Sequence, residues 1–179
     1  NQGGPSLDEP THTDLEPRAA GSSGDGYIWK YLFSVKPSQA IKFDSTAYLP
    51  VPDTWFTSST YAPVKENAAA SGQLKICTIT SRGVGLGTAN ITYTNVPILG
   101  DGAGAKATVV INNDSKVESV TVADGGGGYT YANVDLAAGG VPTGTTTPTF
   151  EVIIPPPGGH GANVYLELGA LNAMAYARF

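Results

Sequence analysis

The sequence repeats itself at an offset of 43 residues, from Leu74 to Val117, and this repeat limits the possible folds more than any other feature. The segment 74–93 aligns with the segment 117–136, and the same offset carries 109–111 onto 152–154. The identical pairs are Thr78/Thr121, Gly83/Gly126, Gly85/Gly128, Ala89/Ala132 and Asn90/Asn133, and apolar residues coincide at Leu74/Val117, Ile79/Val122 and Ile91/Val134. Internal self-similarity of this kind indicates a duplicated structural unit.

Each copy of the repeat reads as strand, Gly-rich turn, strand, loop, strand. The glycines fall where the chain must reverse, a position that favours positive φ. We therefore predict a compact duplicated β module over about 74–154, bounded at 73–157, in which 74–93 and 117–136 superpose as equivalent units.

The segments on either side of the module predict a β core. Aromatic and β-branched residues alternate over 27–35, which is typical of a strand buried between two layers. Pro37 ends this strand, and the segment 170–179 also reads as a buried strand. We predict that residues 26–72 and 158–179 form one β-sandwich-like core, and that residues 1–25 form an extended arm or loop.

The module then reads as a domain inserted into that core. An inserted domain needs its entry and exit close together, so we expect Ala70 and Pro157 to lie within roughly 20 Å of each other. We also expect Trp29 and Tyr176 to belong to one body. The linkers 68–72 and 155–159, rich in Ala and Gly at one end and in Pro at the other, suit such junctions.

Composition favours a protein partner over nucleic acid or membrane. Charged residues make up only 14% of the chain, and the net charge is −5, so there is no basic surface for nucleic acid or anionic lipid. No run of about eighteen apolar residues predicts a membrane span. Cys77 is the single cysteine, which excludes an internal disulfide and a cysteine-based zinc site.

None of the motifs in the sequence predicts catalysis, a cofactor or a metal. The glycines of 100–108 lack the Gly-Lys-Ser/Thr end of a phosphate loop, and those of 83–87 are explained by the repeat. The stretch 124–129 offers one acidic residue, too few for calcium. His12 and His160 have no ligand partner at nearby spacing. We expect a protein that is not an enzyme and has no catalytic, cofactor-binding or metal-binding residues.

Two stretches of the flanking segments resemble a baseplate wedge protein of T-even-like contractile-tailed phages. They are Gly24-Asp-Gly-Tyr-Ile-Trp-Lys-Tyr-Leu-Phe33 and the stretch from Ile41 to Trp55, which ends in Leu-Pro-Val-Pro-Asp-Thr-Trp. The segment 158–170 is similar to relatives of that family in marine and cyanobacterial phages. The turns at 126–129 and 100–105 resemble a Gly-rich β module found in many tailed-phage virion proteins, although Leu86 stands where the first copy should have Tyr.

The resemblance implies a non-enzymatic subunit, dimeric within a larger assembly, that joins other wedge proteins of the virion's tail baseplate after synthesis in the host cytoplasm. That family has a further region before the aromatic strand, which leads us to expect a fragment. It implies no residue-level binding site. Two alternatives remain: a capsid-decoration or fibre-attachment protein, and a carbohydrate-binding β-sandwich. Exposed Trp55 and Tyr61 would favour sugar binding, whereas buried aromatics would favour assembly.

Overall fold

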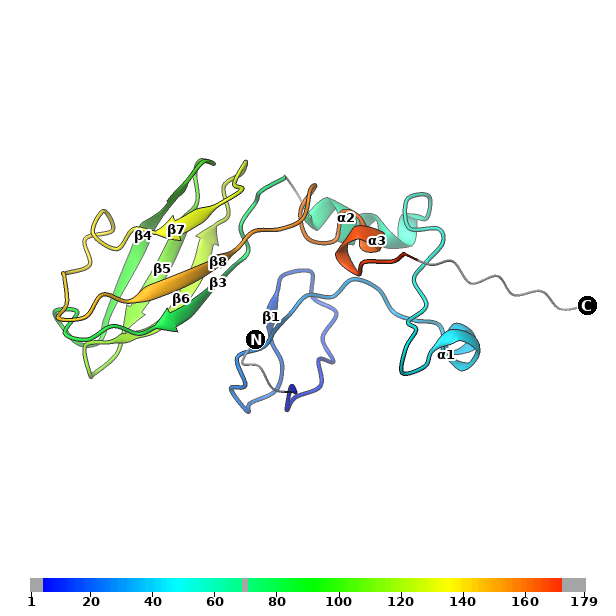
Figure 1. The fold of residues 1–179 in the computed structure, drawn as a ribbon, viewed down its shortest axis with the longest axis horizontal. Coiled ribbons are helices and arrows are strands. Elements are labelled where there is room, and N and C mark those ends of the chain that lie inside the picture. The colour runs from blue at the N-terminus through cyan, green and yellow to red at the C-terminus, as the bar shows by residue number, and fades with distance from the viewer. Residues whose placement is uncertain (1–4, 69–70, 172–179) are drawn as a thin grey trace, which may run out of the picture. The chain divides into compact units, whose positions relative to one another are not determined.

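The computed structural model describes residues 5–68 and 71–171, and the chain is mainly β, as predicted (Figure 1). It divides into two compact units. The first, here called the flanking unit, combines Asn1–Ala68 with His160–Phe179, and the second, the module, is Ala69–Gly159. The flanking unit is therefore discontinuous in sequence, and the module occupies the gap between its two parts.

The module is built from antiparallel strands around one apolar core (Figure 1). Its strands are β3 (Ile76–Ser81), β4 (Ile91–Gly100), β5 (Lys106–Ile111), β6 (Val117–Asp124), β7 (Ala132–Val134) and β8 (Thr149–Ile153). One sheet has the order β6-β5-β4-β7, and β3 pairs with β8 in a second. Because β3 also lies beside β6, and β8 beside β7, the two sheets enclose the core in a sandwich-like arrangement.

The two copies of the repeat exchange strands. The first copy supplies β3, β4 and β5, yet β3 pairs with β8 of the second copy, and β5 pairs with β6 of the second copy. If 43 is added to the number of the β3 residue and subtracted from the number of the β8 residue, each of the five β3–β8 pairs becomes an observed β5–β6 pair. The matching pairs are Ile76↔Ile153 and Val110↔Ser119, Cys77↔Val152 and Val109↔Val120, Thr78↔Glu151 and Thr108↔Thr121, Ile79↔Phe150 and Ala107↔Val122, and Ser81↔Thr149 and Lys106↔Asp124.

The same symmetry extends beyond the strands. The bridge Val84↔Thr146 is equivalent to Gly127↔Ala103. The N–H of Leu74 donates to the carbonyl of Gly125, and its counterpart, the N–H of Val117, donates to the carbonyl of Arg82, both at 2.9 Å. The predicted duplication is therefore confirmed at the level of backbone hydrogen bonds, and it produces a pseudo-two-fold module.

Cys77 lies in the core of the module as a free thiol. Burial raises the pKa of this thiol to about 12, because the charged thiolate would lose its hydration. Cys77 therefore acts as a small apolar packing group, and its equivalent in the second copy is Val120.

The prediction of a β core in the flanking unit is wrong. The aromatic stretch 27–35 forms a strand only at Ile28–Trp29 (β2), which pairs with Arg18–Ala19 (β1). The remaining elements are helical: α1 (Pro37–Phe43), the 3₁₀ turn η1 (Ser59–Tyr61), α2 (Ala62–Asn67) and α3 (Val164–Glu167). The strand predicted over 170–179 falls largely on residues 172–179, which lie outside the described residues.

Local signals explain these helices. Pro37 and Pro63 stand at the first turns of α1 and α2, where a missing N–H costs nothing and the fixed φ suits a helix. The side chain of Asn163 caps α3 by accepting hydrogen bonds from the N–H groups of Tyr165 and Leu166. Residues 30–35 alternate as a strand does, but no ladder continues along them, and the side chains of Tyr31, Leu32 and Phe33 pack on a small core instead.

That core contains residues from both parts of the flanking unit. Trp55, Val64 and Val164 are buried, and Leu32 and Tyr165 pack against them. The indole Nε1 of Trp55 donates to the carbonyl of Ala162 at 3.1 Å, and the hydroxyl of Tyr165 donates to the carbonyl of Pro52 at 2.6 Å. The chain before the module and the chain after it therefore form one folded body.

Of the two forms predicted for residues 1–25, an extended arm or a loop, the described residues 5–25 adopt a closed loop. One carboxylate oxygen of Asp25 accepts hydrogen bonds from the hydroxyl of Ser6 at 2.7 Å and the N–H of Leu7 at 2.8 Å. Asp8 accepts from the N–H of Ser23 at 2.8 Å. The hydrogen bonds to Asp25, that of Ser6 above all, lower the pKa of its carboxyl to about 2. The acidic residues of this segment thus close the loop.

The two ends of the module lie side by side. The N–H of Gly158 donates to the hydroxyl of Ser71 at 3.0 Å, and the carbonyl of Ser71 accepts from Gly128 of the module at 2.9 Å. Adjacent ends are what an inserted domain requires. The predicted distance between Ala70 and Pro157 and the predicted shared body of Trp29 and Tyr176 are not tested, because Ala70 and Tyr176 lie outside the described residues.

The glycines of the repeat allow a direct stability test. Gly126 has φ +54°, and an added Cβ would collide with the carbonyl oxygen of Ala103, whereas Gly140 has φ +75° with open space around it. We predict that Gly140→Ala lowers the free energy of unfolding by about 1 kcal/mol through backbone strain alone. Gly126→Ala should lower it by about 3 kcal/mol, because strain and collision combine. Urea unfolding of both variants measures the difference, and equal losses would contradict the assigned turn.

Candidate functional site

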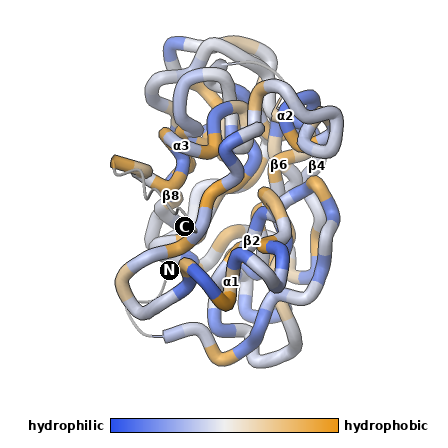
Figure 2. Tube along the Cα trace, turned by 90° about the vertical axis from the view of Figure 1, so that its right-hand side faces the viewer, coloured by the Kyte–Doolittle hydropathy of each residue, from blue (hydrophilic) through white to orange (hydrophobic). Residues whose placement is uncertain are grey.

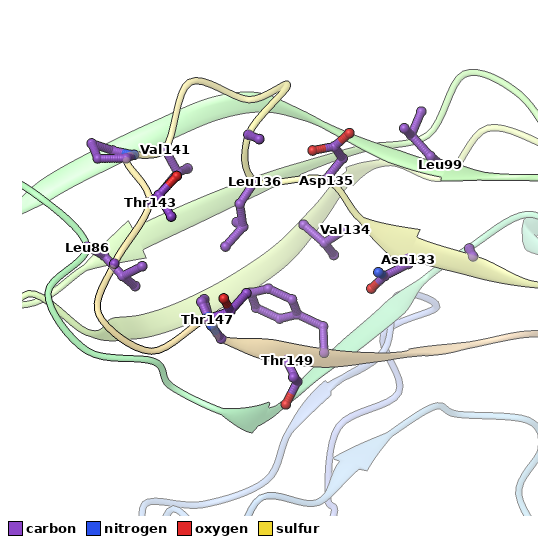
Figure 3. Close-up of a pocket in the computed structure, with 16 residues that line it drawn as sticks. Leu86, Leu99, Asn133, Val134, Asp135, Leu136, Val141, Thr143, Thr147 and Thr149 are labelled. Carbon is purple, nitrogen blue, oxygen red and sulfur yellow. The ribbon is translucent and has the colours of Figure 1, made fainter.

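A groove of about 830 Å³ opens on the module beside β7 and β8 (Figure 3). Its apolar lining includes Leu86, Val134, Leu136, Val141 and Phe150. Its polar lining includes Asn133, Asp135, Thr143, Thr147 and Thr149. The side chains come from β7, from β8 and from the long loop between them, so the second copy of the repeat supplies most of the site.

The groove exists because the second copy departs from the symmetry. In the first copy, β4 pairs with β5 from Ile91↔Ile111 to Pro97↔Lys106. The equivalent strand of the second copy ends at Val134, and the chain then turns. In this turn the N–H of Val141 donates to the carbonyl of Leu136 at 2.9 Å. Within the described residues β7 therefore forms no ladder with β8, and the space between them stays open.

Sequence differences explain this turn. Asp135 caps it, because its carboxylate accepts a hydrogen bond from the N–H of Ala138 at 3.0 Å. The following residues, Ala-Ala-Gly-Gly over 137–140, have low strand propensity, whereas the first copy has Thr-Asn-Val-Pro. Gly139 is also required by packing: a Cβ there would lie 2.7 Å from Cγ1 of buried Val96, its own symmetry equivalent. Only one of these two positions can carry a side chain.

A second difference between the two copies lies at the position of Tyr129. Tyr129 is buried, and its hydroxyl donates to the carbonyl of Ile98 at 3.0 Å and accepts from the N–H of Ala105 at 3.1 Å. The equivalent position in the first copy is Leu86, which is shorter and has no hydroxyl. The equivalent of Ala105 is Pro148, which has no N–H to offer. The groove therefore lies beside the counterpart of the Tyr129 site, where the buried side chain of Leu86 takes the place of the tyrosine.

The groove has little charge. Among the described residues that line it, Asp135 carries the only charge, and part of its carboxylate caps the turn. Asp101 lies outside the lining and accepts hydrogen bonds from Thr130 and from the N–H of Tyr131, which lower the pKa of its carboxyl to about 2. These bonds fix the turn that leads into β7. The site can therefore bind by packing and neutral hydrogen bonds rather than by strong electrostatics.

The structure gives His160 a partner that its sequence neighbourhood did not show. Its Nδ1 lies 2.6 Å from Oε1 of Glu167, whose other oxygen accepts from the N–H of Gly161 at 2.9 Å. Burial opposes ionisation of Glu167, but the hydrogen bonds from His160 and Gly161 outweigh it and lower its pKa. Asn163 was the sequence signal that could have predicted this pair. It caps the short helix α3, and this helical turn places Glu167 next to His160.

The other motifs singled out in the sequence form turns. Residues 101–105 join β4 to β5, and the glycines at 83–87 and 125–128 follow β3 and β6. His12 lies 4.0 Å from a carboxylate oxygen of Asp14 and does not approach His160 in any contact the structure shows. The described part of the chain holds no group of three or more His, Cys, Asp or Glu side chains placed to bind a metal ion.

Of the aromatic pair proposed for sugar binding, Trp55 is fully buried and Tyr61 is partly buried. Trp55 has an exposed fraction of 0%, and its ring stacks on that of Tyr61 with centroids 4.9 Å apart. Phe33 contacts the indole edge-on. The two aromatics form the core of the flanking unit.

Large apolar side chains instead lie exposed on the flanking unit. Figure 2 marks the apolar residues of the chain in orange, and some of them lie at or near α1 and α3. We call them the exposed apolar set: Ile28, Ile41, Tyr48, Leu49, Phe56, Leu166, Leu168 and Leu171. Ile41 is 87% exposed and Leu171 is 91% exposed. Single exposed apolar residues are ordinary, whereas larger contiguous apolar patches are typical of surfaces that bind other molecules.

Comparison with family models, curated proteins and solved structures found no significant match to this chain. None of the helices in the described ranges has both the length and the apolar character needed to cross a membrane.

The Glu167 pair predicts a pH dependence. In the folded chain the pKa of Glu167 lies below its ordinary value of 4.5. The ionised Glu167 therefore contributes its full stability above pH 4.5, and this contribution is lost as the pH falls through the folded pKa. We expect Glu167→Gln to be less stable than the parent at pH 7, and the difference to shrink below about pH 4. Thermal unfolding across this range tests it. A difference that stays constant with pH would contradict the ionised pair.

Proposed function

We propose that this chain is a non-enzymatic structural subunit of a phage virion, a component of the baseplate wedge that assembles through protein–protein contacts. Its partners are other wedge proteins and a second copy of itself, and its location is the tail baseplate after assembly in the host cytoplasm. The observation that carries the proposal is the exposed apolar set, which surrounds a flanking unit with very few buried side chains.

The energetics favour coverage of this surface by a partner. Full burial of a Leu, Ile or Phe side chain contributes about 1.5–3 kcal/mol relative to exposure. The flanking unit buries Trp55, Val64 and Val164 in its core and leaves Ile41, Phe56 and other members of the set in solvent. Contact with a partner would bury these groups and stabilise both the complex and the unit. Aromatic side chains such as Phe56 and Tyr48 are enriched at interface cores.

Two further observations support a virion role. The stretch 24–33 and the segment 49–55 resemble the wedge family, and both belong to the flanking unit. The duplicated module, with its Gly-x-Gly-Tyr turn at 126–129, resembles one inserted in many tailed-phage proteins. A capsid-decoration or fibre-attachment protein would use the same features. The carbohydrate-binding alternative loses its support, because Trp55 is fully buried and the partly buried ring of Tyr61 stacks on it.

Charge placed within the exposed apolar set should weaken assembly. We predict that the double variant Ile41→Glu, Phe56→Glu reduces self-association by about tenfold or more, because each carboxylate would have to be desolvated at the interface. Ser38→Glu with Thr57→Glu is the matched control, since both residues are exposed, polar and close in sequence to the test positions. Sedimentation velocity over a concentration series measures the association. A parent chain that stays monomeric throughout, or variants that associate equally, would contradict the proposal.

A further inference from the structure

We propose that Lys30 and Asn67 form a covalent isopeptide bond inside the flanking unit, with Glu16 transferring the proton that the reaction requires. The fold brings the three side chains together from separate segments: Glu16 precedes β1, Lys30 follows β2, and Asn67 is the last residue of α2. The chain would be its own substrate and would react once, so this chemistry does not make it an enzyme. The proposal stands apart from the proposed function.

The hydrogen bonds place the lysine amine against the carboxamide. Nζ of Lys30 donates to Oδ1 of Asn67 at 2.7 Å, and Nδ2 of Asn67 donates to Oε1 of Glu16 at 2.8 Å. An ammonium group can only donate hydrogen bonds and a carboxylate can only accept them, so these two contacts fix which end of the carboxamide is oxygen. The carbon between them therefore has a nucleophile on one side, and a proton-transfer group already contacts the nitrogen that would leave.

Packing holds these groups in place. Nζ of Lys30 also donates to the carbonyl of Leu15 at 2.6 Å. Leu15 and Tyr31, the sequence neighbours of the two charged residues, pack against the buried core of the flanking unit, and Val64, in the turn before Asn67, belongs to that core. Groups held about 3–3.5 Å apart in a fixed orientation react far faster than the same groups free in solution.

The reaction is a balanced exchange of one amide for another. Lys30 gives up a proton, and its neutral amine attacks Cγ of Asn67 to form the Nζ–Cγ bond. Glu16 then takes a second proton from the attacking nitrogen and passes it to Nδ2. The Cγ–Nδ2 bond breaks, and ammonia leaves and takes up the first proton as ammonium. Nothing is oxidised or reduced, so the reaction needs no oxidant or reductant.

Such a bond would stabilise a unit that has few other means of support. The flanking unit has a small core, made of Trp55, Val64 and Val164, and the single cysteine of the chain lies in the module, so no disulfide can cross-link the unit. A bond between residues 30 and 67 closes a loop that contains α1 and α2. It would restrict the unfolded chain as a disulfide does.

Intact-mass spectrometry of the full-length chain tests the proposal. The folded chain should weigh about 17 Da less than its sequence, which is the mass of the ammonia released. Trypsin should fail to cleave after the modified Lys30, and the segments 19–42 and 66–75 should be recovered as one branched peptide. A chain kept unfolded in guanidinium chloride should retain its full mass, because the three groups are then apart.

Variants assign the roles of the three side chains. Lys30→Arg removes the nucleophilic amine and Asn67→Ala removes the carboxamide, so both should restore the full mass. Glu16→Gln can still accept the hydrogen bond but cannot take up the proton, and it should slow the reaction by about tenfold or more. Lys65→Arg is the matched control, since Lys65 lies on the same helix and donates to backbone carbonyls instead, and it should keep the mass loss.

The branched peptide is sought in the parent chain, so the test holds even if a variant fails to fold. A folded parent that keeps its full mass and yields 19–30 and 66–75 as separate peptides would show a hydrogen-bonded network only, and would overturn the proposal. A mass loss of the same size that persists in Lys30→Arg would also overturn it, because the ammonia would then come from another reaction.

Discussion

The cross-pairing of strands between the two repeats is the constraint on which the module depends. Strand β3 of the first copy has its ladder on β8 of the second, and β6 of the second has its ladder on β5 of the first. Neither copy can satisfy the backbone hydrogen bonds of its own first strand, so the two must fold together. This pairing also closes the module into one body whose ends meet at Ser71 and Gly158. Such a body can be inserted without disturbing the core that contains Trp55 and Val164.

Near-symmetry, rather than perfect symmetry, gives the module its groove. The strand pairing is equivalent in both halves, but Tyr129 is buried in one and the shorter Leu86 is buried at the equivalent position of the other. The close approach of Gly139 to Val96 forces a further difference, because two side chains cannot share that space. Leu86, Val134 and Val141 line the groove and also belong to the buried core, so both halves contribute to the packing of the module. The exposed apolar set belongs to the flanking unit.

The sequence predicted the features that depend on local chemistry. The repeat and its paired glycines, such as Gly83 and Gly126, foretold the duplicated β module because equivalent turns need equivalent residues. The offset did not reveal that the strands cross-pair, since pairing within or between copies gives the same pattern. The alternation over 27–35 suggested a long strand, but a strand needs a neighbour, and tertiary packing on Trp55 prevailed. The groove could not be predicted from the sequence for a similar reason. It depends on the early end of β7 before residues 137–140 and on the tertiary packing of Leu86 beside residues of the second copy.

Fragment complementation of the module tests the central claim most directly. Residues 71–115 and 116–159 would be produced separately, each containing one copy of the repeat, and then mixed in equal amounts. Cross-pairing predicts that each piece alone lacks cooperative β structure as a monomer, and that the mixture forms a one-to-one complex with the circular dichroism and amide spectrum of the intact module. A monomeric single copy that folds cooperatively by itself would contradict the exchange of strands, and with it the origin proposed for the groove.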